Sequence, residues 1–544
     1  MKRRSLLAGA ALPLAGSLLG CDRLEEIQGG FTGIAHERGH LLRERKAWPA
    51  PSKVHKTRVI IAGGGVAGLA AARALRLKGM DDFALLELED EVGGNSRGGT
   101  VNGIACPLGA HYLPVPGDGA SEVQDLLEEL GLRKRVSGRW EYDERHLCHS
   151  PQERLFFNGE WQDGLLPLQG VGRGTLAQYQ RFAALVEQAR KASKWAIPIS
   201  KEPIALAKYS FLAITFEDYL NQNGLTDPHL RWYLDYCCKD DYGAGITTVS
   251  AWAGVHYFAS RHGFNAPRAD GAGVAETRDR EGVLTWPEGN GWLTRQLALP
   301  LKERVQTDRV VVRIAAGKHG VEVDAFNTAT QTVERWQAER CIVALPIFVA
   351  ARVVENPPEF LRQAAARTRY APWLVANIHL KARLHDRPGT PPSWDNVIHD
   401  AATQKGHAEN VQGTGLGYVD AMHQSLQSVP GATVLTHYRA LGDVPQGRKL
   451  LMDKPWMEWR DVILADLARA HPDIAAKATR IDITRYGHAM AVPVPVTDGN
   501  PSARFAAAGR LSFAHSDWAG YSVFEEAFTL GHRAGLSAGS AASG

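Results

Sequence analysis

Glycines at a spacing suited to phosphate binding follow a short apolar run over residues 58–62. A glycine turn between a strand and a helix directs backbone N–H groups and the positive end of the helix dipole toward an anion. The run and the helical composition of residues 69–75 place the glycines in such a turn. The residues that we expect to form the phosphate-binding turn are Gly63, Gly65, Val66, Ala67 and Gly68.

A carboxylate at the end of the next apolar run completes the pattern. Glu87 closes the run at residues 83–87 and follows Gly68 by 19 residues. At this distance a carboxylate accepts hydrogen bonds from ribose hydroxyls and repels a 2′-phosphate. Strand, glycine turn, helix and acid together predict a dinucleotide-binding unit, whose ligand is NAD or FAD.

The residues after Glu87 resemble the signature of the flavin-containing amine oxidase superfamily. In that signature a Glu is followed at fixed spacing by two glycines and an Arg, which here are Gly93, Gly94 and Arg97. The resemblance implies FAD, bound without a covalent link, with the glycines close to the cofactor and the arginine meeting the pyrophosphate charge. Asn95 stands where the superfamily usually has another arginine.

Three further segments extend the resemblance. Gly109 and Ala110 match the segment that runs beside the isoalloxazine ring, and Val310 matches a contact with the adenine. Ser516 and Asp517 replace the usual Gly-Glu pair, as in the spermidine dehydrogenase branch. The resemblance implies that Asp517 holds a ribityl hydroxyl with help from Ser516.

Aromatic rings enclose the substrate nitrogen in this superfamily, since an aromatic face attracts a cation and excludes water. The candidates for the flavin face are Tyr521, Trp518 and His111. Tyr521 takes the cage position if Gly520 anchors the alignment. If the later glycine of the C-terminal helix is the anchor, Val523 takes that position instead.

Asp240 and Asp241 stand among aromatic residues and are candidates for binding a cationic polyamine. A solvated acidic turn is the alternative. His256 is a further substrate candidate, with a satisfied core histidine as its alternative. Cys237 and Cys238 are either a vicinal disulfide or two small buried residues, and no cysteine spacing indicates a metal site.

The superfamily often places a lysine near flavin N5, on a strand where it promotes reaction with dioxygen. The comparable strand has Ala376 or Asn377 at that position, and Lys381 lies beyond it. We therefore expect a dehydrogenase that takes hydride from a small-molecule amine onto N5 and passes electrons to a periplasmic carrier or a quinone. A flavin desaturase or isomerase acting on an apolar substrate shares these motifs, and so does a non-catalytic flavoprotein of electron relay or complex assembly.

These segments must be brought together by a chain of 544 residues, which is too long for one core. We expect an α/β fold in which a Rossmann-type FAD-binding domain is interleaved with a mixed α+β substrate domain. The FAD-binding parts are residues 56–118, 283–348 and 481–544, and the substrate parts are 119–282 and 349–480. A formal net charge of +3 gives no indication of nucleic-acid binding.

The N-terminus has the pattern of an export signal. Arg3 and Arg4 precede an apolar run over residues 6–19 and then Cys21, which resembles a twin-arginine signal ending in a lipobox. We expect a signal over residues 1–20 and a lipid anchor on Cys21. Residues 21–55 are expected to form a tether or a loosely packed lead-in to the first domain. The expected location is the periplasmic face of a bacterial inner membrane, and the oligomeric state stays open.

Overall fold

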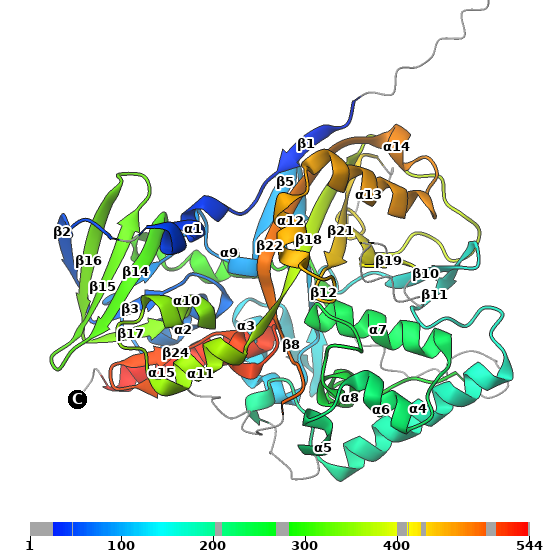
Figure 1. Cartoon of the computed structure of the whole chain (residues 1–544), viewed down its shortest axis with the longest axis horizontal. Coiled ribbons are helices and arrows are strands. Elements are labelled where there is room, and N and C mark those ends of the chain that lie inside the picture. The colour runs from blue at the N-terminus through cyan, green and yellow to red at the C-terminus, as the bar shows by residue number, and fades with distance from the viewer. Residues whose placement is uncertain are drawn as a thin grey trace, which may run out of the picture.

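The structure is a computed structural model, and it has two lobes with elements from distant parts of the sequence in each (Figure 1). It describes residues 26–45, 47–201, 209–267, 282–399, 411, 413–425, 431–496 and 507–541. The predicted signal and Cys21 lie outside these ranges. No helix within them is both long and apolar enough to cross a bilayer.

A six-stranded sheet forms the centre of one lobe. Its order is β13 (Val305–Gln306), β4 (Phe83–Leu86), β3 (Val59–Ala62), β17 (Arg340–Val343), β24 (Leu511–Phe513) and β23 (Ala507–Ala508). All neighbours are parallel except the last pair. Each residue of β3 is buried, as expected for the middle of a parallel sheet covered on both faces.

Two helices pack closely beside this sheet, α2 (Val66–Leu77) and α15 (Phe524–Ala541). A Cβ atom at Gly531 of α15 would come within 2.0 Å of the carbonyl oxygen of Ala67. Glycine there allows the two backbones to touch. The same lobe contains α3 (Ser121–Glu129), α9 (Gly291–Ala298), α10 (Ile347–Val353) and α11 (Glu359–Arg367).

A four-stranded sheet lies at the outer end of this lobe (Figure 1). Its order is β14 (Arg309–Ala316), β15 (Val321–Asn327), β16 (Thr332–Ala338) and β2 (Lys53–Lys56). Three two-stranded sheets complete the strands. Two of them are hairpins, β5 (Gly98–Val101) with β6 (Ile104–Pro107) and β8 (Arg133–Val136) with β9 (Arg139–Tyr142), and the third pairs β7 (Tyr112–Pro114) with the distant β12 (Val283–Thr285).

The second lobe is built on an eight-stranded mixed sheet. Its order is β1 (Gln28–Phe31), β22 (Ala478–Val492), β18 (Arg369–Leu380), β21 (Thr433–Ala440), β20 (Gly415–Asp420), β19 (Asp395–Ile398), β10 (Glu153–Phe157) and β11 (Glu160–Asp163). The two faces of β18 alternate, so that Val375 joins one hydrophobic core and Leu374 the other.

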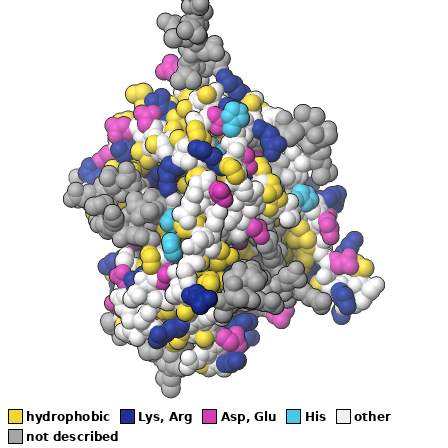
Figure 2. All heavy atoms as spheres, turned by 90° about the vertical axis from the view of Figure 1, so that its right-hand side faces the viewer, with side chains coloured by type: hydrophobic (Ala, Val, Ile, Leu, Met, Phe, Trp, Pro, Cys, Tyr) yellow, Lys and Arg dark blue, Asp and Glu magenta, His cyan; other side chains and the backbone are white. Residues whose placement is uncertain are grey.

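Helices cover both faces of this sheet. On the face of Val375 lie α4 (Arg173–Ala192), α5 (Tyr209–Leu212), α6 (Phe216–Gln222), α7 (Pro228–Tyr242) and α8 (Ala251–Ala259). On the opposite face lie α12 (Gly447–Asp453), α13 (Trp456–Ala468) and α14 (Ile474–Lys477). The outer side of this lobe carries charges of both signs scattered among apolar side chains (Figure 2).

The N-terminal lead-in, residues 26–45 and 47–56, contains regular secondary structure, whereas a tether is one expectation for residues 21–55. It forms β1, the helix α1 (His36–Glu44) and β2. β1 pairs in parallel with β22, and β2 pairs in parallel with β16, so the lead-in contributes a strand to each lobe. The expectation of a tether is wrong here because backbone pairing, which the sparse apolar pattern does not reveal, holds the segment. β22 also crosses the expected domain boundary at residue 480.

Candidate active site

Two glycine turns meet at the carboxyl end of β3. The N–H of Gly93 donates to the carbonyl of Gly64 at 2.8 Å, and Gly65 and Gly93 form an isolated parallel bridge. A Cβ atom at Gly65 would have its nearest neighbour, the Cα of Gly94, 4.0 Å away. Beyond this glycine cradle lies open space at the N-terminus of α2, which is where a phosphate group is bound most favourably.

The open space belongs to a cavity of about 1290 Å³ between the two lobes. This volume exceeds the upper end of the usual range for one small ligand, about 1,000 Å³. Most of the predicted cofactor residues line it. They are Gly63, Gly65, Val66, Ala67, Glu87, Gly93, Gly94, Arg97, Gly109, Ala110, Val310, Ser516 and Asp517.

Gly68 does not line the cavity but lies in the first turn of α2. A Cβ atom on it would stand 1.9 Å from the carbonyl oxygen of Gly63. Gly68 therefore lacks a side chain so that the helix can pack on the turn. Gly65 lacks one where a ligand needs room.

Glu87 is buried at the end of β4 and is fixed by the backbone. One carboxylate oxygen accepts from the N–H of Gly64 at 2.7 Å and the other from the N–H of Glu89 at 2.9 Å. Burial raises its pKa, against the effect of these hydrogen bonds. Each oxygen keeps a further lone pair for ribose hydroxyls. The cradle, the helix terminus and this carboxylate fit the adenosine diphosphate part of FAD.

Arg97 lines the cavity and is held by the N-terminal lead-in. Its guanidinium donates to the carbonyl of Gly33 at 2.7 Å and to Asp90 at 2.8 Å. The N–H of Ala35 in turn donates to Glu89 at 3.1 Å. The lead-in thus covers one side of the cavity, and α1 lines it. No motif in the sequence indicates this role.

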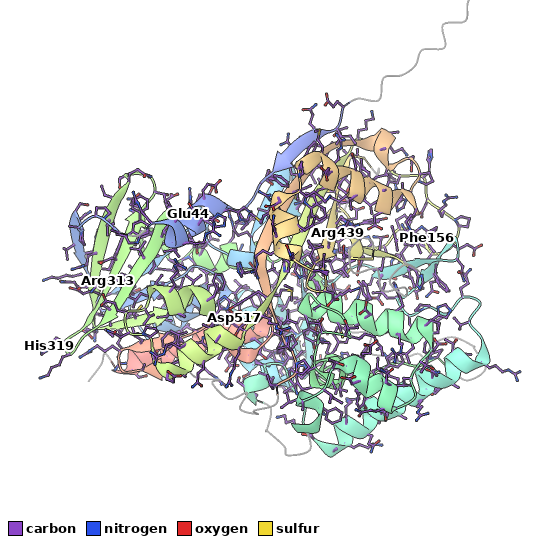
Figure 3. All side chains as sticks on the ribbon, viewed as in Figure 1. Glu44, Phe156, Arg313, His319, Arg439 and Asp517 are labelled. Carbon is purple, nitrogen blue, oxygen red and sulfur yellow. The ribbon has the colours of Figure 1, made fainter. Side chains whose placement is uncertain are left out.

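Asp517 lies at the junction of the two lobes (Figure 3). Its carboxylate accepts from the hydroxyl of Tyr370 at 2.6 Å and from the N–H of Ile347 at 3.0 Å, and it pairs with His515 at 3.1 Å. Burial acts to raise its pKa, but the nearby His515 and these hydrogen bonds outweigh burial and lower it. An ionised acceptor at this junction suits a hydroxyl group of the cofactor.

The structure separates the three candidates for the flavin face. Tyr521 is buried away from the cavity, where its hydroxyl donates to Glu526 at 3.1 Å. Trp518 is packed between Phe513 and Phe360. Neither residue lines the cavity, because Trp518 is packed in one hydrophobic core and Tyr521 in another. Val523, the alternative to Tyr521, lines the cavity.

His256 is also absent from the cavity wall. It stacks on Trp252 with ring centroids 4.5 Å apart, and its Nε2 lies 3.2 Å from the carbonyl oxygen of Ala196. The alternative considered for it, a satisfied core histidine, describes its position. Cys237 and Cys238 are buried free thiols in α7.

His111 lines the cavity, as predicted. It belongs to the part of the wall that also contains Tyr112, Asp240, Asp241 and Tyr438, which we call the inner end. Its ring stacks on Tyr438 at 4.5 Å and lies near Tyr112 and Trp394. Burial lowers the pKa of His111 to about 3, so the ring is neutral at physiological pH. This region therefore offers aromatic faces and no fixed positive charge on the histidine.

Asp240 and Asp241 both line the inner end but differ in charge balance. Asp241 forms an ion pair with Arg261 at 2.8 Å. Burial, followed by the charge of Asp241, raises the pKa of Asp240 to about 7, although a hydrogen bond with Tyr112 opposes this. Asp395 behind it also has a raised pKa, chiefly through burial and then through Asp240. The inner end thus holds one carboxylate that is paired with Arg261 and a second carboxyl group, Asp240, that is about half ionised near pH 7.

The β18 residues that line the cavity are Tyr370, Trp373 and Val375. Asn377, one of the two residues aligned with the superfamily's lysine, donates to the carbonyl of Pro107 at 2.9 Å and accepts from Thr436 at 2.7 Å. Ala376 belongs to the opposite face of the strand. Neither aligned residue lines the cavity, and none of the three β18 residues that do is a lysine.

A Rossmann-type sheet with a glycine cradle at a cavity shared with a second sheet defines a dinucleotide-binding protein. The chain belongs to the family of flavin containing amine oxidoreductases, whose family model matches residues 66–535. It is therefore an FAD-dependent amine oxidoreductase, as the sequence resemblance implies, and the α/β fold prediction is confirmed.

Known proteins with similar sequences and structures cover most of the chain. Polyamine oxidase 4 of Oryza sativa subsp. japonica is 25% identical over 439 residues, which span 79% of this chain and 76% of that protein. L-amino acid dehydrogenase of Synechocystis sp. is 23% identical over 507 residues, 87% of this chain and 93% of that protein. The structure of a putrescine oxidase bound to putrescine has a TM-score of 0.62 at 18% identity, over 89% of this chain and 99% of that one.

Proposed function

We propose that this enzyme dehydrogenates a primary or secondary amine that carries a second cationic group, as polyamines do. The observation that carries the proposal is the acidic inner end of the cavity, where Asp240 lies among His111, Tyr112 and Tyr438. A second ammonium group pairs with the ionised form of Asp240 and so favours it, and the aromatic faces attract the cation further. An apolar substrate offers no such partner to this carboxyl group, which disfavours the desaturase or isomerase alternative.

The residues of the chain bind and orient the substrate, while FAD when bound supplies hydride acceptance at flavin N5. Asp240 holds the distal ammonium and so fixes the distance from the inner end to the reacting carbon. Neutral His111 and the apolar wall around Val375 and Val523 exclude water. A dry wall favours the unprotonated form of the reacting amine, which is the form that donates hydride. The imine product hydrolyses after release.

Bleaching of the flavin absorbance under anaerobic conditions tests this proposal. We expect putrescine and spermidine to bleach the purified holoenzyme faster than butylamine, which has no second cation. Amino acids are expected to react slowly, since their carboxylate meets the charge of Asp240. Bleaching by butylamine at the same rate as by putrescine contradicts the proposed role of the acidic inner end, and no bleaching by any amine contradicts the proposed function.

We propose that oxygen is not the electron acceptor, because the β18 wall presents Val375 rather than a cationic group. A positive charge beside the flavin stabilises the negative charge that develops on oxygen. Val375→Lys is therefore expected to raise the rate of reoxidation by oxygen, by about tenfold. The measurement is stopped-flow reoxidation of the reduced enzyme with detection of hydrogen peroxide. Val375→Met, which is similar in length and uncharged, serves as the control and should reoxidise as slowly as the wild type.

We further propose that FAD is held without a covalent link and that the enzyme is anchored at the periplasmic face of the inner membrane. None of the described cysteines lines the cavity, which supports the first point. β1 begins shortly after Cys21, so a lipid on Cys21 holds the folded domain close to the bilayer. If FAD is not covalently bound, acid precipitation of the protein should release free FAD. If Cys21 carries the lipid anchor, Cys21→Ala should move the enzyme from the membrane fraction to the soluble periplasm.

A further inference from the structure

The end of the cavity opposite Asp240 has the reverse electrostatic character. It lies between α1 and α12, which belong to different lobes (Figure 1). We call it the basic end, and its charged or titratable side chains are His36, His40, Arg43, Arg352, Arg448, Lys449, Asp453, Arg485 and His488. Lys449 pairs with Asp453, so the remaining groups decide its charge.

Arg448 and Arg485 have no carboxylate partner among the residues that the structure describes. The Nε of Arg448 donates to the carbonyl of Gly487 at 2.7 Å. Arg485 donates to the carbonyl of Met452 at 2.8 Å, and its guanidinium lies 3.6 Å from the centre of the Phe31 ring. No carboxylate of the described residues therefore balances Arg448 on the cavity wall, while the charge of Glu37 partly balances Arg485 without forming an ion pair with it.

The pKa values of two histidines at the basic end are lowered, first by burial and then by the neighbouring cations. Burial, and then the charge of Arg448, lowers the pKa of His488 to about 4, although Asp517 opposes this. The pKa of His36 is also lowered, first by burial and then by Arg485 and His40, against the effect of Glu37. Neighbouring cations disfavour protonation where nearby acids do not neutralise them. A bound anion provides the missing negative charge.

Aromatic rings lie beside these cations. His488 stacks on Phe348 with ring centroids 4.3 Å apart, and Tyr370 meets the edge of Phe348 at 5.1 Å. These three rings and Arg448 also line an adjoining pocket of about 540 Å³. Flat aromatic faces next to an unpaired guanidinium suit a planar aromatic ligand with negatively charged oxygen atoms.

The basic end is distinct from the groups that fit the cofactor phosphates. Those phosphates have the glycine cradle and the N-terminus of α2, both in the lobe of the six-stranded sheet. Arg448 and Arg485 instead belong to α12 and β22, on the eight-stranded sheet and the helix packed against it. The size of the cavity leaves room for a second ligand beside the cofactor.

We propose that the basic end binds the electron acceptor, a planar quinone-type molecule that carries negative charge, with Arg448 as its main cationic contact. The proposal rests on the proposed function as a dehydrogenase. In the oxidative half-reaction the acceptor takes up two electrons and two protons and leaves as the hydroquinone. The reduced cofactor loses the same two electrons and two protons and returns to its oxidised form.

Two matched acceptors test the proposal, 1,4-naphthoquinone-2-sulfonate and the neutral 1,4-naphthoquinone. The holoenzyme is reduced with dithionite and mixed anaerobically with each acceptor, so the result does not depend on the identity of the amine. The second-order rate constant for the sulfonate should exceed that for the neutral quinone and fall with ionic strength. Arg448→Gln should lower it by about tenfold and change the rate with the neutral quinone less than twofold.

Binding of the sulfonate to the oxidised holoenzyme gives a second readout without turnover. By calorimetry, Arg448→Gln should raise its Kd by about tenfold, and Arg448→Lys should recover part of the loss. Arg460→Gln is the charge-matched control, because Arg460 pairs with Asp461 and does not line the cavity. Equal rate constants and Kd values in Arg448→Gln and Arg460→Gln overturn the proposal.

The test also separates this proposal from a role of Arg448 in holding FAD. Loss of bound FAD in Arg448→Gln, or slower anaerobic reduction by an amine, assigns the arginine to the cofactor or substrate and overturns the proposal. Rapid reoxidation of the wild-type enzyme by oxygen contradicts the proposed dehydrogenase function instead. Reoxidation by oxygen and the Arg448→Gln results come from separate measurements, so failure of the dehydrogenase function is distinguishable from failure of the acceptor site.

Discussion

Gly65→Val is expected to abolish FAD binding while leaving the fold intact. Gly65 has a φ of −69° and a ψ of −175°, an extended conformation open to any residue. Its added side chain meets only the Cα of Gly94 at 4.0 Å, so it extends into the space of the phosphates. We expect the affinity for FAD to fall by at least about a hundredfold, the effect of losing two or more charge-assisted hydrogen bonds. Flavin absorbance per protein and titration of the apoprotein measure it.

Gly68→Val gives the contrasting control. Its side chain is directed at the carbonyl of Gly63, 1.9 Å from the added Cβ atom, so α2 must move away from the turn. This variant should unfold at a lower temperature than the wild type even as apoprotein, whereas apo Gly65→Val should not. If Gly65→Val keeps its FAD, the glycine cradle is not the phosphate site.

Asp240→Asn is expected to lower kcat/KM for putrescine by about tenfold to a hundredfold, because it removes a charged hydrogen-bond acceptor from a buried site. The loss for butylamine should be small, since butylamine has no second cation. Asp240 has a pKa of about 7, so the wild-type kcat/KM should rise with pH through this region as the carboxylate ionises. In Asp240→Asn, kcat/KM should not rise with pH in this region. If the rise persists in the variant, another group is responsible for it.

The same carboxyl makes stability depend on pH. Its pKa in the folded protein, about 7, lies above the ordinary aspartate value of 3.8, so folding disfavours its ionised form. Stability should fall as the pH rises from about 4 to about 7, where the unfolded chain ionises and the folded protein does not. Asp240→Asn removes this cost. It should unfold at a higher temperature than the wild type at pH 8, and the difference should disappear near pH 4.

Local motifs located the glycine turns and the acid at the cavity, because the geometry of these turns is set within a few residues. The turn from Gly63 to Gly68 needs only the strand before it and the helix after it, and both are encoded in adjacent residues. Glu87 and Gly93 follow on the next strand and turn. The glycines and the acid therefore line the cavity or pack against its turn as expected.

The substrate face was predicted less well, because long-range packing decides which side chains reach the cavity. Tyr521 and Val523 are two residues apart, and only the placement of α15 against α2 decides that Val523 faces the cavity. Trp373 and Tyr438 come from neighbouring strands of a mixed sheet, whose pairing no local motif specifies. His256 has apolar neighbours in the sequence. The same local pattern is expected whether its side chain faces a ligand or the hydrophobic core.

The pairing of β1 with β22 has a consequence for the order in which the protein matures. Gln28 lies opposite Arg480, so the first strand has no partner until the ribosome has made nearly the whole chain. Closing such a long loop is a late step in folding. The lead-in, which also holds Arg97 through Gly33, is then expected to settle after the lobes have formed. A segment made early in translation is thus expected to be among the last to take its place in the fold.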